Sequence, residues 1–315
     1  MKIAYIAVLL LVVCSAAAGK DNLAPRQGFI DVPGGPVWYR ISGSGPGIPV
    51  LALHGGPGGV SCGFARLEPL GELRPIVRYD QLGTGRSGRP DDLSLWTVER
   101  YVEELHVLRT KLGLTQMHLL GHSWGASLAA AYVLAKGTEG IASVVFSSPL
   151  LSTPLWVRDA NLQRRQLPED VQRTLAEHEK AGTTDSKEYL AASEIYNERH
   201  MYAGKRPVPP GECKGAPESQ VIYEYMWGPQ EFFATGTLLD FDITARLHEI
   251  DVPVLFMTGE FDEARPETVA GFQKLIPGAQ FTVIRDAGHA TLSKQPVEYL
   301  SVLKNFLESV ERRPQ

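Results

Sequence analysis

The sequence predicts an α/β protein with a mostly parallel central sheet, helices on both faces and an inserted helical cap. Three observations lead to this prediction. Short apolar runs alternate with segments of helical periodicity, the alternation stops between residues 147 and 246, and it resumes over residues 247–315. Strands and helices that alternate along a chain form parallel sheets covered by helices on both sides.

The composition is that of a soluble globular enzyme. The chain has 315 residues, a formal net charge of -5 and 43% hydrophobic residues. This length is sufficient for a full hydrophobic core. Because nucleic-acid binding depends on an excess of basic side chains, which this chain lacks, we expect no nucleic-acid partner.

The N-terminus has the features of a secretory signal peptide. Lys2 precedes an apolar run from residue 3 to residue 13, and small residues follow at positions 15–19. The run is too short to span a bilayer comfortably. We therefore assign residues 1–24 to the signal peptide and the start of the mature chain. We expect export to a periplasm or secretion, and no stable membrane span in the mature chain.

The three cysteines leave two questions open. Anchoring as a lipoprotein through Cys14 is an alternative to secretion, although Val13 is not the small residue that such a site has before its cysteine. If Cys14 is removed with the signal peptide, Cys62 and Cys213 remain. They can pair in an oxidising compartment, but cysteines so far apart in a chain are more often independent.

Residues 25–146 are predicted to form the first part of the core. Apolar or alternating runs indicate strands, and apolar residues spaced three and four apart indicate helices. The predicted strands are 37–41, 49–53, 75–79, 117–120 and 141–146, and the predicted helices are 94–112 and 126–135.

The rest of the chain divides into a cap and a second core segment. Residues 147–246 contain charged, helix-leaning segments such as 169–175, and proline breaks them at 207–211. We predict a helical cap there. Residues 247–315 return to the core with strands at 252–257 and 280–284 and helices at 267–275 and 297–310.

A Gly-x-Ser-x-Gly pattern at residues 121–125 follows one predicted strand and precedes a predicted helix. This context is that of a nucleophile elbow, in which a sharp strand-to-helix turn exposes Ser123. The pattern also occurs by chance in glycine-rich chains, so it does not identify a catalytic serine by itself.

Two further residues complete a catalytic triad. Asp262 and His289 each lie in a loop just after a predicted strand, and both follow Ser123 in the chain. The order Ser, Asp, His is the order of an α/β-hydrolase. We predict that His289 takes the serine proton and that Asp262 orients the imidazole. Asp80, at the end of an earlier strand, is the alternative acid.

The tetrahedral intermediate of such a reaction needs hydrogen-bond donors. The backbone amide of Trp124 lies next to the serine, and the glycine-rich loop at residues 54–59 follows an early strand. We therefore predict an oxyanion hole formed by the amides of Gly56 and Trp124. Three nearby polar residues receive structural interpretations: Ser127 packs within its helix, His122 points away from the serine, and His54 braces the glycine loop.

With these pieces in place, the chain resembles the proline iminopeptidase family of α/β-hydrolases (peptidase family S33), which includes tricorn-interacting aminopeptidases and L-amino acid amidases. Five segments carry the resemblance: residues 54–59 (HGGPGG), 79–87 (YDQLGTGRS), 121–125 (GHSWG), 226–232 (MWGPQEF) and 259–263 (GEFDE). General lipases and esterases lack the second and fourth of these segments, so the combination is specific.

The resemblance implies a serine hydrolase of the prolyl aminopeptidase type, with an acyl-enzyme intermediate. It would release an N-terminal residue, proline or another, from short peptides or aminoacyl amides. The resemblance also implies that Glu231 and Glu263 bind the substrate amine, with Glu260 as the alternative to Glu263. A general carboxylester hydrolase and a non-catalytic binding protein on a hydrolase scaffold remain alternatives. No sequence feature requires a metal ion or another cofactor.

Overall fold

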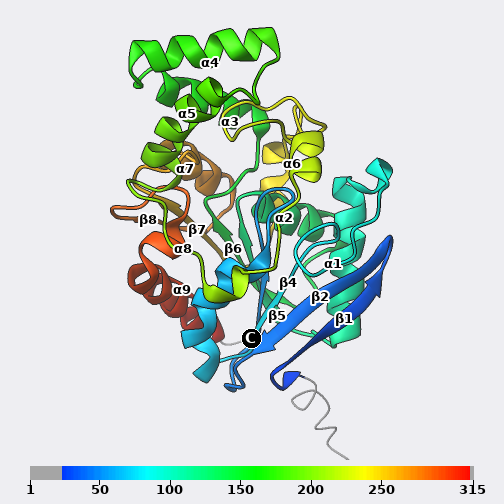
Figure 1. Ribbon diagram of the computed structural model, residues 1–315. Helices are drawn as coiled ribbons and strands as arrows, with labels where there is room; N and C mark the ends of the chain where they lie inside the picture. The colour runs from blue at the N-terminus through cyan, green and yellow to red at the C-terminus, as the bar shows by residue number, and fades with distance from the viewer. Residues whose placement is uncertain (1–22, 313–315) are drawn as a thin grey trace, which may run out of the picture.

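Eight strands form one central sheet in the order β1-β2-β4-β3-β5-β6-β7-β8 (Figure 1). The coordinates are a computed structural model that describes residues 23–312, so most of the predicted signal segment 1–24 lies outside the described residues. The strands are β1 (Arg26–Val32), β2 (Gly35–Ser42), β3 (Val50–Leu53), β4 (Ile76–Tyr79), β5 (Met117–His122), β6 (Ile141–Ser147), β7 (Val254–Gly259) and β8 (Gln280–Ile284). The six neighbouring strands β4, β3, β5, β6, β7 and β8 are parallel, which confirms the predicted α/β fold.

Strand β1 is the element that the sequence analysis did not predict. It pairs antiparallel with β2, and β2 pairs antiparallel with β4, so the sheet has an antiparallel edge. The strand alternates, because Ile30 and Val32 are buried while Phe29 and Asp31 are exposed. A turn at Gly34 then joins it to β2. This alternation before a two-residue turn at Pro33 and Gly34 was the available signal for a hairpin.

Helices cover both faces of the sheet, and the sheet separates two hydrophobic clusters. One face packs against α1 (Val98–Leu112), α2 (Trp124–Lys136) and α7 (Pro266–Leu275). The opposite face packs against the 3-10 helix η2 (Ser61–Glu72) and the C-terminal helix α9 (Pro296–Glu311). The short helix α8 (Thr291–Lys294) precedes α9.

The chain between β6 and β7 is helical, as the sequence predicts for the cap. It contains α3 (Thr153–Arg164), α4 (Glu169–Ala181), α5 (Lys187–Tyr196), the π-helical turn η4 (Asn197–Met201), η5 (Gly211–Cys213), α6 (Gln220–Met226) and η6 (Thr244–Glu249). Helices α3, α4 and α5 lie together at the top of Figure 1. They share a small core around Leu175, Tyr189, Tyr196 and Phe232. The boundaries 147 and 246 stay predictions.

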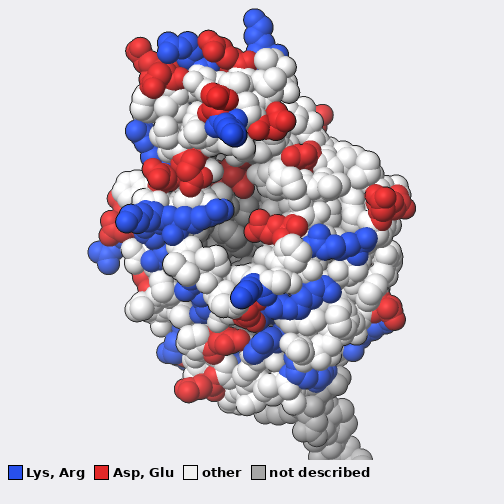
Figure 2. All heavy atoms as spheres, viewed as in Figure 1, with Lys and Arg blue, Asp and Glu red and all other residues white. Residues whose placement is uncertain are grey.

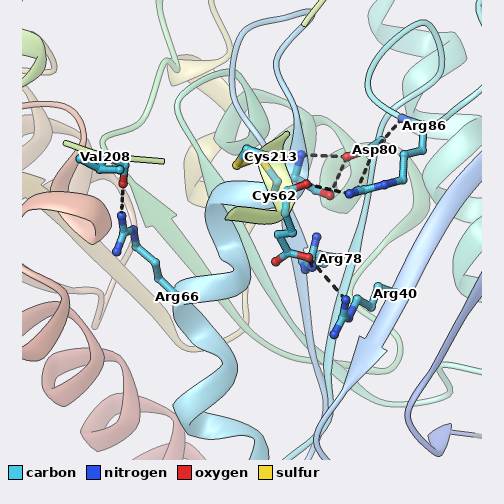
Figure 3. The surroundings of a disulfide bond; sticks show 10 residues. Arg40, Cys62, Arg66, Arg78, Asp80, Arg86, Val208 and Cys213 are labelled. Atoms are coloured by element: carbon cyan, nitrogen blue, oxygen red, sulfur yellow. Dashed lines mark hydrogen bonds and ion pairs between the residues drawn. A yellow bond between two sulfur atoms is a disulfide. The ribbon is translucent and has the colours of Figure 1, made fainter. Parts of the chain in front are cut away.

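The structure answers one of the two questions that the sequence leaves open about the cysteines. Cys62 and Cys213 form a disulfide across 151 residues of sequence, with their Cα atoms 5.2 Å apart (Figure 3). Their proximity depends on residues 202–219, which we call the strap. The strap leaves the cap and runs along η2, where Arg66 donates a hydrogen bond to the carbonyl of Val208 at 2.6 Å. Sequence separation gave no indication of this path.

The strap also holds a charge cluster against the sheet. The guanidinium of Arg78 is buried and pairs with Glu212, and Arg40 lies 3.5 Å from the same carboxylate. Arg86 donates to the carbonyl of Glu212 at 2.7 Å. At the end of the strap, the amide of Ser219 donates to the carbonyl of Gly58 at 2.8 Å. The strap is therefore anchored to the core on both sides of the disulfide.

Candidate active site

Ser123 occupies a strained turn between β5 and α2. Its φ and ψ are 55° and -123°, a region that non-glycine residues rarely adopt. The chain folds this tightly because its flanking positions carry no side chain. A Cβ atom at Gly121 would lie 2.2 Å from the carbonyl oxygen of Gly125, and one at Gly125 would lie 2.1 Å from that of Leu53. The turn is a nucleophile elbow.

Asp262 and His289, which follow β7 and β8, come together beside this turn. His289 Nδ1 lies 2.8 Å from Asp262 Oδ1. The carboxylate also accepts hydrogen bonds from the Ser148 hydroxyl at 2.6 Å, the Gly259 amide at 3.0 Å and the Ala264 amide at 2.9 Å. Each carboxylate oxygen is therefore hydrogen-bonded, and Nε2 of His289 remains for proton transfer.

The charges of this group favour an ion pair. Burial raises the pKa of Asp262, but the charge of His289 and the hydrogen bonds from His289 and Ser148 outweigh burial, so the pKa is lowered. Burial lowers the pKa of His289, but the charges of Asp262 and Glu263 outweigh it and raise the pKa to about 9. The site thus stabilises the imidazolium that a serine hydrolase forms when its base takes a proton.

Ser123 and His289 open into a cavity of about 570 Å³ between the core and the cap. Figure 2 shows a hollow on this face of the molecule, with acidic and basic side chains around its rim. Gly56 and Glu231 are part of the cavity wall. The volume falls within the range of small-molecule sites.

The predicted oxyanion donors flank the elbow. Trp124 is the first residue of α2, so its amide has no intrahelical acceptor. Gly56 belongs to the loop that packs against the serine. A Cβ atom at the neighbouring Gly55 would lie 2.9 Å from Ser123 Cβ. The roles of Gly56 and Trp124 stay predictions, but the loop is close enough to the serine for them.

Gln81 joins these two elements. Its side-chain amide donates to the carbonyl of His54 at 3.0 Å and accepts from the Trp124 indole at 3.0 Å. Its backbone amide donates to Nε2 of His54, also at 3.0 Å. Burial lowers the pKa of His54, so its ring is neutral and braces the loop. The 79–87 segment therefore has a structural function that its sequence did not explain.

The two predicted amine-binding glutamates differ in their exposure to the cavity. Glu231 is half-buried on the cavity wall. Two indoles fix its loop, because Trp156 donates to the carbonyl of Glu231 and Trp227 to that of Gln230, each at 2.9 Å. Glu263 is buried behind the wall, with Oε1 3.7 Å from His289 Nδ1.

Neither carboxylate oxygen of Glu263 has a hydrogen-bond partner. Burial and the charge of Glu231 raise its pKa well above the ordinary range. Burial also raises the pKa of Glu231, against the effect of His289. The pKa of each carboxyl group is thus raised although the charge of His289 acts in the opposite direction, and a bound ammonium group would offset this deficit of positive charge.

The alternatives considered from sequence lie elsewhere. Glu260 is exposed and accepts a hydrogen bond from the Asp286 amide at 3.1 Å. Asp80 accepts from the amide and hydroxyl of Ser61 at 2.9 and 2.7 Å, so it holds the start of η2. Ser127 donates to the carbonyl of Leu150. Among residues 23–312, no group of three or more His, Cys, Asp or Glu side chains is placed to hold a metal ion.

The sequence analysis expects His122 to point away from the serine, but in the structure its side chain lies beside the site. Its ring packs on that of His289, with the centroids 4.8 Å apart. Burial and the nearby charge of His289 lower the pKa of His122 to about 3. The neutral ring therefore supports the base without adding a second positive charge.

Several supporting residues could not be identified from sequence. Ser148 holds Asp262, and Gln163 of α3 donates to the carbonyl of Asp262 at 2.7 Å. Tyr196 of α5 in turn donates to Gln163 at 2.8 Å. In η4, the carbonyl of His200 accepts the His289 amide at 2.8 Å. The cap therefore contacts both the acid loop and the base loop.

The chain is similar to known hydrolases over most of its length. Residues 48–296 match the model of the alpha/beta hydrolase fold family. The proline iminopeptidase of Heyndrickxia coagulans is 44% identical over 286 residues, which are 90% of this chain and 99% of that protein.

Solved structures give the same result. The crystal structure of a proline iminopeptidase from Mycobacterium smegmatis has a TM-score of 0.80 and 30% identity, and the alignment covers 91% of this chain and 99% of that one. The crystal structure of VinJ has a TM-score of 0.83 and 32% identity, over 90% of this chain and 99% of that one. With the predicted fold and the elbow geometry described above, these matches show that the chain belongs to the proline iminopeptidase family of α/β-hydrolases.

Proposed function

We propose that this protein is a serine exopeptidase that releases an N-terminal residue, proline first among the candidates, from short peptides and aminoacyl amides. One observation carries the proposal beyond hydrolysis in general. The carboxyl group of Glu263 is buried without a hydrogen-bond partner, next to His289 and in the field of Glu231. A free ammonium group beside the scissile bond would supply the charge-assisted hydrogen bond that this carboxyl group lacks.

The reaction follows from the positions of the three triad residues. His289 Nε2 takes the proton of Ser123, whose oxygen attacks the substrate carbonyl, and the amides of Gly56 and Trp124 stabilise the oxyanion. The protonated His289 then gives its proton to the leaving amine, and an acyl-enzyme forms. Water, activated by the same base, releases the amino acid. Asp262 stays ionised throughout, because the charge of His289 and the hydrogen bonds to the carboxylate lower its pKa.

The amine anchor distinguishes an exopeptidase from a general esterase. An ammonium group between Glu231 and Glu263 forms charge-assisted hydrogen bonds in a partly dry site, where they are strong. It also fixes the distance from the N-terminus to Ser123, so only the first residue can be removed. A blocked N-terminus has no charge and leaves Glu263 unpaired.

A panel of aminoacyl arylamides tests the proposal. Proline, alanine, leucine and phenylalanine substrates are compared with and without an N-terminal acetyl group, and kcat/KM is measured for each. We expect hydrolysis of the free amines, the prolyl substrate foremost, and loss of turnover on acetylation. Ser123→Ala should abolish turnover of all substrates. Equal rates on blocked and free substrates would favour a general carboxylester hydrolase instead.

We also propose that the protein is exported. The basic start, short apolar run and small residues of segment 1–24 support this. The Cys62–Cys213 disulfide supports it as well, because structural disulfides persist mainly in oxidising compartments. Cell fractionation with thiol labelling of the mature chain tests the proposal, and a cytosolic protein with two free thiols would contradict it.

A further inference from the structure

Arg206 of the strap lies on the wall of the same cavity as Ser123 and Glu231. Its guanidinium stacks on the ring of Tyr202, 5.3 Å from the ring centroid, and Tyr202 also lines the cavity. Within residues 23–312, no acidic side chain forms an ion pair with Arg206. The cavity therefore carries a cation that the protein itself does not neutralise.

Two acidic residues, Glu218 and Glu231, line the same cavity. Glu218 lines the cavity, and its charge contributes to the raised pKa of Glu231. Burial raises the pKa of Tyr202, on which Arg206 and Glu231 act in opposite directions. The cavity wall therefore carries charges of both signs, the carboxylates of Glu218 and Glu231 and the guanidinium of Arg206.

A short peptide has the matching distribution of charge. Its ammonium group and its terminal carboxylate lie at opposite ends, and an extended chain spans at most about 3.6 Å per residue. When the first residue occupies the site beside Ser123, the carboxylate of a dipeptide or tripeptide lies about one or two residue lengths past the scissile bond. Arg is well suited to that group, because its planar fork binds carboxylate oxygens in pairs.

We propose that Arg206 binds the terminal carboxylate of the leaving group, so that the preferred substrates are free-acid dipeptides and tripeptides rather than amides. This inference rests on the proposed exopeptidase function and names its substrate class. Arg206 is exposed, so solvent weakens the interaction, and its contribution to kcat/KM should be about two- to fivefold.

The test compares prolyl-alanine with prolyl-alaninamide, which differ only in the terminal charge. For the wild-type protein we expect kcat/KM to be about two- to fivefold higher for the free acid, with the ratio falling toward one at high salt. Arg206→Gln should bring the ratio to about one, by a larger loss of kcat/KM for the free acid than for the amide. Arg206→Lys should retain part of the preference.

Lys205 provides the matched control. It is an exposed neighbouring cation that does not line the cavity, so Lys205→Gln makes the same change in net charge without touching the site. We expect it to keep the wild-type ratio. A wild-type ratio of one, or equal effects of Lys205→Gln and Arg206→Gln, would overturn the proposal. Because hydrolysis of the amide still reports the exopeptidase reaction, such a result would leave the proposed function intact.

Discussion

Asp262 and Glu263 are consecutive residues with carboxyl groups in opposite surroundings. Each is 1% exposed. Asp262 accepts hydrogen bonds from two backbone amides, the Ser148 hydroxyl and His289, whereas Glu263 accepts none. Accordingly the pKa of Asp262 is lowered and that of Glu263 is raised well above the ordinary range. The comparison separates a carboxylate that the protein stabilises for itself from one that it leaves for a ligand.

The difference arises from the elements around each side chain. The carboxyl ends of β6 and β7 surround Asp262 and supply Ser148 and the Gly259 amide. Among the charges that act on the pKa of Glu263, the largest effect comes from the carboxylate of Glu231 in the cap. A buried polar group without a partner costs about 1–3 kcal/mol, and more when it is charged. The core thus holds the Asp262 carboxylate with hydrogen bonds, whereas Glu263, beside the cap residue Glu231, is left without any.

The largest expected effect is the loss of kcat on replacing Asp262, the carboxylate that the protein stabilises. Asp262→Asn keeps the shape of the side chain but removes the charge that orients His289 and stabilises its imidazolium. We expect kcat to fall by about 10⁴-fold. The loss should be similar for a free-amine arylamide and for a neutral ester, because both reactions use the same base. Steady-state kinetics on the two substrates checks this.

A loss confined to the amine-bearing substrate would contradict the assignment of Asp262 to the triad. Asp80→Asn is the control, since Asp80 is an equally buried aspartate that holds Ser61 rather than His289. It should lower stability but leave kcat of the folded protein within a few-fold of the wild-type value.

Glu263→Gln should have a smaller and more selective effect. Loss of a charge-assisted hydrogen bond to the substrate ammonium, about 1.5–3 kcal/mol, corresponds to about 10- to 100-fold in kcat/KM. We expect that loss of kcat/KM for free-amine substrates, mainly through a higher KM. Glu231→Gln should change kcat/KM for these substrates in the same direction. A neutral ester should be unaffected or faster near neutral pH. The charge of Glu263 helps to raise the pKa of His289 to about 9, so its removal leaves more of the base unprotonated.

The matched control for this prediction is Glu260→Gln. Glu260 carries the same charge three residues earlier but is exposed and bonded to the Asp286 amide. Its replacement should leave both substrates unaffected. If Glu263→Gln reduced ester and amine substrates equally, Glu263 would be a support for His289 and not an amine anchor.

The sequence alone is sufficient to predict that Asp262 lies near Ser123 and His289. Ser123, Asp262 and His289 occur in a fixed order after strands, and a parallel sheet brings the ends of those strands to one edge. The oxyanion role of the Trp124 amide, inferred from its position beside the serine, stays a prediction. These inferences need only local patterns and the rule that connects them in a parallel sheet.

The remaining features depend on contacts that no local pattern specifies. Ser148 holds Asp262 because β6 and β7 are neighbours in the sheet, although 114 residues separate the two side chains. Cys62 and Cys213 meet because the strap returns to η2. The high pKa of Glu263 depends on the docking of the cap, which places Glu231 near it. The sequence shows residue types, but the field at Glu263 is a property of the assembled cap and core.

The smallest expected effect is on stability, and its sign should differ between the two carboxyl groups. The pKa of Glu263 is raised in the folded state, so the unfolded chain loses its proton first. Folding stability is therefore lost as the pH rises above the ordinary glutamate pKa of about 4.3. We expect Glu263→Gln to be more stable than the wild type by about 1–3 kcal/mol at pH 8, with the gain vanishing toward pH 4.

The pKa of Asp262 is lowered, so its contribution is present above about pH 4 and is lost on acidification. Asp262→Asn should thus be less stable than the wild type at pH 8, with a deficit that shrinks as the pH falls. Urea unfolding at pH 4, 6 and 8 measures both differences, and a Glu263→Gln protein less stable than the wild type at pH 8 would show that its carboxyl group is satisfied.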